Sequence, residues 1–265
     1  VSSFDCSSIG DNAVELTVED ESGNSATETA IVTIQDNLDP TIVTQDITVD
    51  LDANGEATIT PDQIDNGSSD NCGIVSSTLD ISDFDVNDLG ANPVILSVFD
   101  DSGNSKSSTA IVTVEDNTNP VANCSPFIIN NYDWSNGEFH MLLSHVNNGS
   151  TDNSGIDIIE LVRDDDNDGI PDGSWSDRIT YSCNDIGLTN YLLRVTDIGG
   201  NQSICSNTVT INDVTPPVVE VQDINVFLDI NGQASITPSM INNASSDDCG
   251  IATLTLDKVN FDCSD

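Results

Sequence analysis

Basic residues, histidines and long apolar runs are scarce in this chain of 265 residues. Five Lys and Arg stand against 46 Asp and Glu, which gives a formal net charge of −41 at pH 7. Nucleic acids and anionic membrane faces are recognised mainly through Lys and Arg, so the composition argues against both as partners. No run approaches the roughly 20 apolar residues of a membrane-spanning helix. We therefore expect no direct membrane insertion.

Residues that commonly perform catalysis are also few. His140 and His145 are the two histidines, and neither has a Cys or carboxylate at zinc-ligand spacing. The sequence has no G-x-S-x-G elbow and no phosphate-binding Gly-rich loop before a helix. Aspartates are so abundant that a pair of them identifies no acid–base site. We expect a protein that is not an enzyme.

The chain nevertheless has enough apolar residues to fold. Hydrophobic residues make up 37% of it, which argues against simple disorder. So many negative charges repel one another when the chain compacts. Divalent cations among the carboxylates would relieve that repulsion.

Internal repeats are the strongest feature of the sequence. The junctions "QDNLDP", "EDNTNP" and "NDVTPP" end at Pro40, Pro120 and Pro217, which are 80 and 97 residues apart. Each follows a Val/Ile/Thr-rich segment, as in "TAIVTIQD", and each such segment follows a turn such as "DDSGN". Short strands separated by turns predict an all-β sandwich in tandem copies. Helix is expected only as single turns at Thr60-Pro61 and Thr237-Pro238, where a cap residue precedes a proline.

The junctions divide the chain into four parts. Residues 1–38 are expected to form the C-terminal half of an immunoglobulin-like repeat, and 39–118 a complete repeat. Residues 119–215 would form a repeat with an inserted loop, and 216–265 the N-terminal half of another. The chain thus begins and ends within a repeat, and we interpret it as an interior part of a longer protein.

These phrases carry a family resemblance. The combination of "DNxDP", "DxSGN", "SSDNCGI" and "FDC" resembles HYR-type immunoglobulin-like repeats, especially those of the large SprB-like gliding and surface adhesins of Bacteroidetes. The resemblance covers nearly the whole chain. It implies fibronectin-like β-sandwich repeats in an extended array, export to the bacterial cell surface, and a part in attachment or gliding motility.

Seven cysteines predict an oxidising compartment with one cysteine unpaired. Cys249 and Cys263 lie 14 residues apart at two recurring positions, and a disulfide across that loop would add about 3 kcal/mol of stability. We predict that disulfide. Cys6 occupies the position of Cys263 in its repeat, and we expect it to be unpaired.

The other cysteines leave alternatives open. Cys72 and Cys183 lack cysteines at the equivalent positions of their own repeats, so either could be a free thiol. The resemblance implies a disulfide from Cys124 in the first strand to Cys205 in the last strand of the middle repeat. A Cys183–Cys205 bond is the rival pairing.

The inserted loop "RDDDNDGIPDG" has the alternating oxygen donors of a calcium loop, with Gly169 at the bend. The predicted ligands are four carboxylates and one carbonyl: Asp164, Asp166, Asp168, Asp172 and the carbonyl of Ile170. Trp175 stands where an EF-hand places its bidentate Glu, so the loop is EF-hand-like and resembles dockerin or thrombospondin type 3 loops. The alternative is a solvated acidic turn.

A second class of calcium site is predicted where successive repeats join. In an immunoglobulin-like sandwich the B–C and F–G loops gather at the end where the chain enters, beside the junction. The candidate ligands are the aspartates of these loops and junctions: Asp36, Asp39, Asp70 and Asp100 at the first junction, and Asp116, Asp152 and Asp197 at the second. The alternative is that these aspartates only form turns.

The sequence favours a stalk or spacer segment of a large secreted bacterial cell-surface adhesin, stiffened by calcium. Its partners would be neighbouring repeats, surface polysaccharide or other copies of the adhesin. The alternative is a polysaccharide-binding module in the middle repeat, with Trp134 and Trp175 as an exposed aromatic platform.

Overall fold

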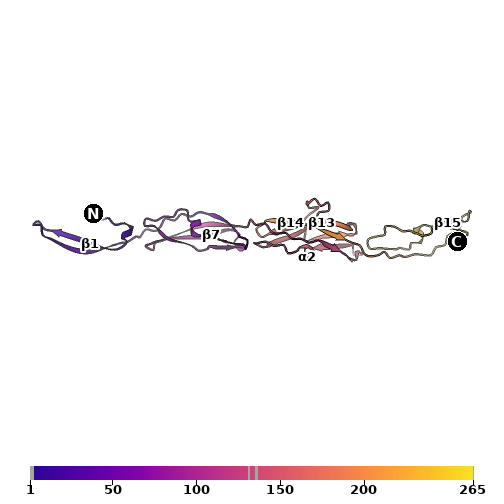
Figure 1. Cartoon of the computed structure of the whole chain (residues 1–265), viewed down its shortest axis with the longest axis horizontal. Coiled ribbons are helices and arrows are strands. Elements are labelled where there is room, and N and C mark those ends of the chain that lie inside the picture. Colours follow the sequence, from indigo (N-terminus) through magenta and orange to yellow (C-terminus); the bar gives the residue numbers. More distant parts are fainter. Residues whose placement is uncertain (1–2, 131, 135–136, 265) are drawn as a thin grey trace. The chain divides into compact units, whose positions relative to one another are not determined.

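The computed structural model describes residues 3–130, 132–134 and 137–264. The chain divides into two compact units, Val1–Thr118 and Asn119–Asp265, and strands dominate both (Figure 1). No helix in the described ranges is long and apolar enough to cross a membrane.

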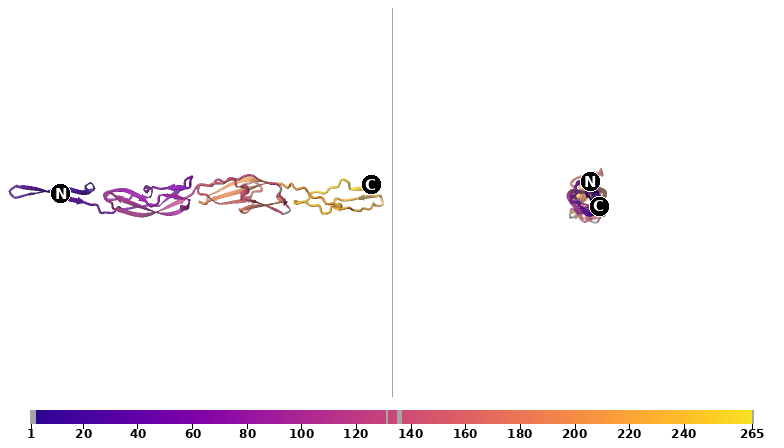
Figure 2. Two further views of the ribbon diagram at one scale, coloured as in Figure 1. Left: turned by 90° about the horizontal axis from the view of Figure 1, so that it is seen from below. Right: turned by 90° about the vertical axis from the view of Figure 1, so that its left-hand side faces the viewer.

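The first unit contains a two-stranded hairpin followed by a sandwich. Its strands are β1 (Gly10–Glu19), β2 (Ser25–Ile34), β3 (Ile47–Asp50), β4 (Glu56–Thr58), β5 (Ile74–Leu79), β6 (Asp83–Asp85), β7 (Gly90–Asp100) and β8 (Ser105–Glu115). Its short helical turns are η1 (Cys6–Ser8), α1 (Pro61–Ile64) and η2 (Val86–Asp88). β1 pairs with β2 in a hairpin, drawn in indigo near the N-terminus in Figure 2. One sheet has the order β3-β8-β7-β5, and β4 pairs with β6.

Alternation of apolar residues explains the strands of this sandwich. Val94, Leu96 and Val98 stand at every second position of β7, and each is at most 1% exposed. They form one core with Val112 of β8 and Phe84 of β6. The core therefore joins the four-stranded sheet to the β4–β6 pair.

The second unit contains a larger sandwich followed by a less regular segment. Its strands are β9 (Phe127–Ile129), β10 (Glu138–Leu142), β11 (Ile156–Arg163), β12 (Arg178–Ser182), β13 (Gly187–Asp197), β14 (Gln202–Ile211), β15 (Gln233–Ser235) and β16 (Asn260–Asp262). Its helical turns are α2 (Leu143–Val146), η4 (Cys183–Asp185) and α3 (Pro238–Ile241). One sheet has the order β11-β13-β14-β9, and β10 pairs with β12 and β15 with β16.

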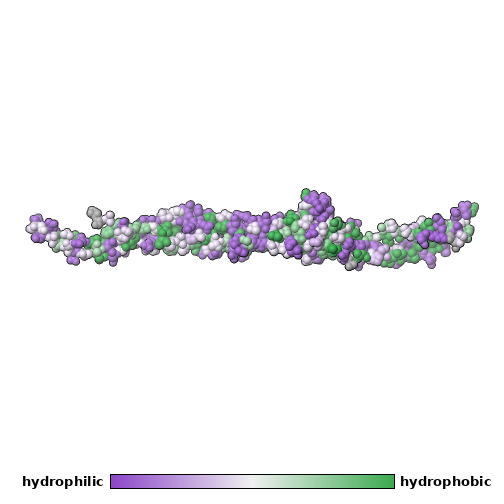
Figure 3. Space-filling model, in the orientation of Figure 1, coloured by the Kyte–Doolittle hydropathy of each residue, from purple (hydrophilic) through white to green (hydrophobic). Residues whose placement is uncertain are grey.

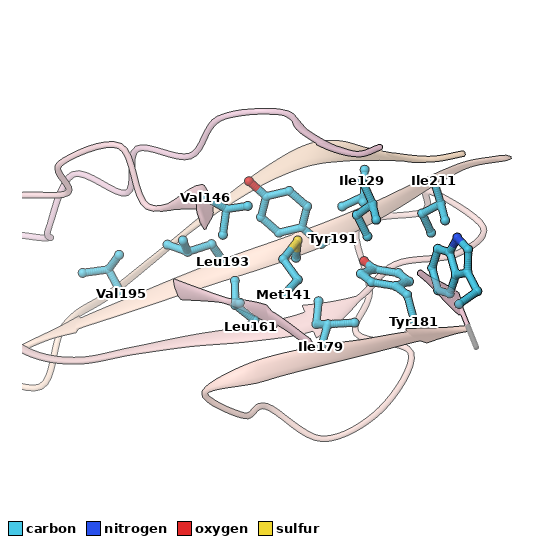
Figure 4. Packing of buried hydrophobic residues seen from close by; sticks show 12 residues of the cluster. Ile129, Met141, Val146, Leu161, Ile179, Tyr181, Tyr191, Leu193, Val195 and Ile211 are labelled. Carbon is cyan, nitrogen blue, oxygen red and sulfur yellow. The ribbon is translucent and has the colours of Figure 1, made fainter. Parts of the chain in front are cut away.

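The core of this sandwich is richer in aromatic residues. Figure 4 shows Tyr181 of β12 and Tyr191 of β13 among aliphatic side chains from both sheets, including Met141 and Leu161. The Tyr191 hydroxyl donates a hydrogen bond to the carbonyl of Ser125 at 2.6 Å. This hydrogen bond offsets the cost of removing the Tyr191 hydroxyl from water, so the ring can be buried.

The predicted fold class, all-β immunoglobulin-like repeats, is confirmed by these sheets. The two predicted helical turns are present as α1 and α3, each with a proline in its first turn. α2 was not foreseen, and His145 stabilises its start by accepting a hydrogen bond from the Leu142 amide at 3.1 Å. The repeat boundaries at residues 38 and 215 stay predictions.

Candidate metal sites

The inserted loop connects β11 to β12 and folds around Asp164, whose side chain is fully buried. Its Oδ1 accepts hydrogen bonds from the amides of Asp168 at 3.1 Å and Gly169 at 3.4 Å. Its Oδ2 is buried and has no hydrogen-bond partner. A buried carboxylate oxygen without a partner is costly, so this atom is suited to a cation.

Two further carboxylates converge on Asp164. One oxygen each from Asp164, Asp166 and Asp172 lie within 4.8 Å of one another. Burial raises the pKa of Asp166, and the negative charges of Asp168, Asp172 and Asp164 raise it further. The ionised form of Asp166 is therefore disfavoured, and a bound divalent cation would stabilise that form again.

The backbone of the loop has the conformation that its sequence predicts. Gly169 has φ +80° and Asn167 has φ +59°, so the chain bends through the left-handed region twice. Asp168 Oδ1 accepts a hydrogen bond from the Ile170 amide at 2.7 Å, and the Ile170 side chain is 63% exposed. Of the five predicted ligands, the structure thus gathers Asp164, Asp166 and Asp172, and the roles of Asp168 and the Ile170 carbonyl stay predictions.

The arginine that directly precedes the loop is held by acids outside the Asp164 cluster. Arg163 lies 3.0 Å from Asp165 and 2.6 Å from Asp185, and its guanidinium lies over the Tyr181 ring at 4.9 Å. Asp165 also accepts a hydrogen bond from the Thr189 hydroxyl at 2.8 Å. These contacts fix the base of the loop and leave the charge of the Asp164 cluster uncompensated.

A second cluster lies in the first unit. One oxygen each from Asp36, Asp70 and Asp100 lie within 4.8 Å of one another. Asp36 follows β2, Asp70 precedes β5, and Asp100 ends β7, so the junction and the two loops meet as the topology predicted. Asp39, the fourth predicted member, instead lies 3.8 Å from Lys106 in an exposed ion pair.

Among the described residues, Asp100 accepts more hydrogen bonds through its side chain than Asp36 or Asp70 does. Its Oδ1 accepts hydrogen bonds from the amides of Ser102 at 2.9 Å and Asn104 at 2.8 Å, and its Oδ2 accepts one from Asn104 Nδ2 at 2.7 Å. Burial alone would raise the pKa of Asp100, but these hydrogen bonds lower it below its ordinary value. The carboxylate is therefore held ionised beside Asp36 and Asp70.

The remaining predicted ligands belong to different units. Asp116 is in the first unit, and its Oδ1 accepts a hydrogen bond from the Thr118 amide at 3.0 Å. Asp152 and Asp197 are in the second, where Asp197 Oδ1 accepts a hydrogen bond from the Asn201 amide at 2.8 Å. Their grouping around a cation stays a prediction.

One cluster was missed by the sequence analysis. An oxygen each from Asp213 and Asp248 and the sulfur of Cys249 lie within 4.8 Å of one another. Asp213 is the second residue of the third junction, as Asp36 is of the first, so the repeat pattern pointed to Asp213. Since Cys249 is in a disulfide, only the two carboxylates are donors for a hard cation.

Three disulfides join Cys6 to Cys72, Cys124 to Cys205 and Cys183 to Cys249. The second is the pair that the family resemblance implied, and the rival Cys183–Cys205 bond is absent.

The predicted Cys249–Cys263 disulfide is wrong. Cys249 bonds to Cys183, with Cα atoms 5.3 Å apart, and Cys263 is free and exposed. Cys6, which was expected to be unpaired, bonds to Cys72, whose pairing was left open. Both bonds join a "FDC" or "YSC" phrase to the "SSDNC" or "SSDDC" phrase of the next repeat, 66 residues later in each case. The prediction failed because it sought partners inside one repeat.

The aromatic platform is contradicted at Trp134. Its side chain is 1% exposed and belongs to the core of the second unit. Its backbone amide donates a hydrogen bond to Asp248 Oδ2 at 3.0 Å. Trp175 is half-buried, and the guanidinium of Arg194 lies over its ring at 4.3 Å. One ring is thus enclosed and a face of the other is occupied.

Comparison with known proteins identifies no family. No protein-family model matches the chain, and no curated protein matches it. Similar solved structures include protocadherin gamma C5 EC1-3, with 12% identity and a TM-score of 0.36 over 77% of this chain and 78% of that one. The N-terminal four Ig domains of Dscam1 isoform 9.44 align with 10% identity and a TM-score of 0.38, over 72% of this chain and 51% of that one.

The chain is an all-β protein of immunoglobulin-like repeats, an assignment that rests on its sheet topology. Its three disulfides favour an oxidising, extracellular environment.

Proposed function

We propose that this chain is a calcium-binding spacer segment of a large secreted adhesin with HYR-type repeats, positioned on a bacterial cell surface and without a catalytic role. The observation that supports this best is Asp164, a fully buried carboxylate with one unpartnered oxygen beside Asp166 and Asp172. Calcium prefers carboxylate oxygens in flexible loops of this kind. Bound there, it would neutralise charge and tie the insertion to β11.

The junction cluster supports a stiffening role. Asp36, Asp70 and Asp100 come from a hairpin end and from two loops of the following repeat. The Cys6–Cys72 disulfide joins the same two parts of the first unit. A cation shared by the three carboxylates would add a second tie, so that the spacer resists bending when calcium is present. Its direct partners would be the neighbouring repeats of the same chain. In attachment or gliding, the partners would be surface polysaccharide or other copies of the adhesin.

The spacer is favoured over a polysaccharide-binding module because Trp134 is enclosed and Trp175 is covered on one face by Arg194. Neither ring matches the exposed platform on which sugars stack.

The test is calorimetric titration of calcium into the chelator-treated chain. We expect binding in the wild type, and loss of one site in Asp164→Asn because that variant removes a negative charge from the buried cluster. Asp177→Asn is the matched control: Asp177 lies in the same connection, its side chain is 72% exposed, and it pairs with its neighbour Arg178 at 3.3 Å. An Asp164→Asn chain that binds as many calcium ions as the control would contradict the loop site.

A further inference from the structure

Asn-Gly pairs recur in the turns of this chain, and four of them lie wholly within the described residues: Asn54-Gly55, Asn66-Gly67, Asn148-Gly149 and Asn231-Gly232. In such a pair the glycine amide nitrogen can attack the side-chain carbonyl carbon, Cγ, of the asparagine, because glycine has no Cβ to obstruct the approach. The peptide group between the two residues has to turn toward the side chain for this to happen. Hydrogen bonds that hold the peptide group or the side chain therefore slow the reaction, since they must break first.

Two of the pairs are held in tight turns. The Gly55 amide donates a hydrogen bond to the carbonyl of Asp52 at 3.0 Å, and Asn54 Nδ2 donates one to Asp52 Oδ2 at 3.1 Å. The turn at residues 229–232 repeats both hydrogen bonds, at 3.0 Å and 3.4 Å. The attacking nitrogen and the side chain under attack are thus both engaged in these two turns.

The pair at Asn66 is not held in this way. It follows α1 in the loop that leads to β5, and Asn66 is exposed. Among the described residues, the Asn66 side chain, the Asn66 carbonyl and the Gly67 amide have no hydrogen-bond partner. Gly67 has φ +94°, and a Cβ placed there would meet nothing within 4 Å. The peptide group after Asn66 can therefore turn without breaking a bond or meeting a neighbour.

The pair at Asn148 is an intermediate case. It occupies the same loop of the second sandwich, and its side chain and the Gly149 amide have no partner in the described part of the chain. Its carbonyl, however, accepts a hydrogen bond from Asn123 Nδ2 at 2.8 Å. Val43 stands at that position in the first sandwich, where it donates its backbone amide to the loop serine as Asn123 does. The side chain of Asn123 thus holds a peptide group whose counterpart in the first sandwich is not held.

We propose that Asn66 is a site of spontaneous deamidation in the folded chain, and that Asn148 is a slower site of the same reaction. The Gly67 nitrogen forms a bond to Cγ of Asn66, and the Cγ–Nδ2 bond breaks. Ammonia leaves with the proton of the Gly67 amide, and a cyclic succinimide remains. Water then opens the succinimide at either carbonyl, which gives aspartate or isoaspartate. On the face that Figure 3 shows, the surface of the first sandwich is largely hydrophilic, so water reaches it.

Conversion changes the loop in two ways. Each event replaces a neutral amide by a carboxylate, in a chain whose net charge is already −41. Isoaspartate also carries the main chain through its own methylene group and so lengthens the loop. The ends of this loop are fixed by the Thr41–Ser69 and Thr44–Asp65 bridges. We expect the isoaspartyl product to loosen these bridges.

Peptide mapping of a single incubated sample tests the proposal. The folded chain is kept in water labelled with a heavy oxygen isotope, at neutral and at mildly alkaline pH. Samples are digested with pepsin at acidic pH, which stops the succinimide reaction, and mass spectrometry follows isotope uptake at each asparagine. We expect Asn66 to convert at least about tenfold faster than Asn54 and Asn231, because each of these has two hydrogen bonds to break. The rate at Asn148 should lie between.

Two comparisons separate the effect of the fold from that of the dipeptide. In urea the four Asn-Gly pairs should convert at similar rates, because the hydrogen bonds that distinguish them are lost. Asn243-Ala244 stands where the first unit has Asn66-Gly67. It should convert more slowly than all four pairs in urea, because the alanine Cβ obstructs the attack.

Asn123→Val is designed to gain reactivity. It copies Val43 and removes the hydrogen bond that holds the Asn148 carbonyl, so conversion at Asn148 should rise toward the rate of Asn66. Asn66 in the same molecule is the unchanged reference. Asn66→Gln is the matched loss variant, and it should remove the fast event while conversion at Asn148 continues at its wild-type rate.

Equal rates at Asn66 and Asn54 in the folded chain would overturn the proposal. So would an Asn66 that converts in urea but stays intact in the folded chain. If Asn123→Val left the rate at Asn148 unchanged, the inferred order of the two sites would be refuted.

Discussion

Aspartate has two tasks at single positions of this chain. In "DDSGN" and its copies, Oδ1 of the first aspartate accepts hydrogen bonds from backbone amides of the turn. Asp100 and Asp20 both show this. The turn interpretation and the metal interpretation of these residues are therefore compatible. The turn fixes the carboxylate and lowers its pKa, which keeps it charged for a cation.

Asp185 offers a test of the charges around the loop. Burial would raise its pKa, but hydrogen bonds from Arg163 and the Ser182 amide lower it below the ordinary value of 3.8. A lowered pKa in the folded state means that its stabilisation is full above the unfolded-state pKa. That stabilisation is lost as the pH falls through the folded-state pKa.

We expect Asp185→Asn to destabilise the second unit by about 1.5–3 kcal/mol at pH 7, the range for a hydrogen bond to a charged group. The difference from the wild type should shrink as the pH falls below 3.8. Urea unfolding at pH 7 and pH 3 measures both. Asp177→Asn, which loses an exposed ion pair, should change stability by less than about 0.5 kcal/mol. If both variants changed the free energy of unfolding equally, the Arg163–Asp185 ion pair would not stabilise the second unit.

At the scale of elements, the disulfides tie hairpins to the loops that follow them. Cys6 precedes β1, and Cys72 lies between β4 and β5 in the next repeat. The bond therefore holds the β1–β2 hairpin, whose own core face is exposed.

Removing this bond should release the hairpin. In Cys6→Ser/Cys72→Ser we expect faster amide exchange across residues 10–34, with exchange in β7 and β8 unchanged because their core is separate. The chain-entropy model gives about 4 kcal/mol for a closed loop of 66 residues, an upper expectation for the loss. Cys263→Ser should leave every segment unchanged. Slow exchange in the hairpin of the double variant would mean that the Asp36 cluster alone suffices to hold it.

The sequence predicted the strands and helical turns better than it predicted their contacts with distant residues. Repeated turn phrases and alternation predicted the sandwiches, the single-turn helices after Thr60 and Thr237, and the meeting of Asp36, Asp70 and Asp100. Alternation describes one repeat at a time, so it did not show that Cys183 bonds to the following repeat. Nor did it show that Trp134 is enclosed, since its side chain packs in a core built from strands distant in sequence, including β12 and β13.

At the scale of the whole molecule, charge is the dominant property. Basic residues that pair with carboxylates include Lys106, Arg163, Arg178 and Arg194. With 46 acidic residues in the sequence, most of the negative charge has no basic partner. Repulsion on this scale opposes compaction and weakens as salt is added.

Two mechanisms of cation stabilisation then predict different results. Screening depends on ionic strength, with a Debye length of about 10 Å at 0.1 M and about 3 Å at 1 M salt. Stabilisation by site binding depends on the dissociation constant. When free calcium exceeds that constant about 100-fold, each site adds about 2.7 kcal/mol of stability.

We expect the melting temperature of the chelated chain to rise gradually with NaCl. About 1 mM calcium at constant ionic strength should raise it further, because calcium at that level is in excess of sites with micromolar constants. Calorimetry with NaCl, magnesium and calcium in parallel distinguishes the two. If NaCl at matched ionic strength raised the melting temperature as much as calcium, the acidic clusters would be a screened surface, and the spacer would owe its stiffness to its disulfides alone.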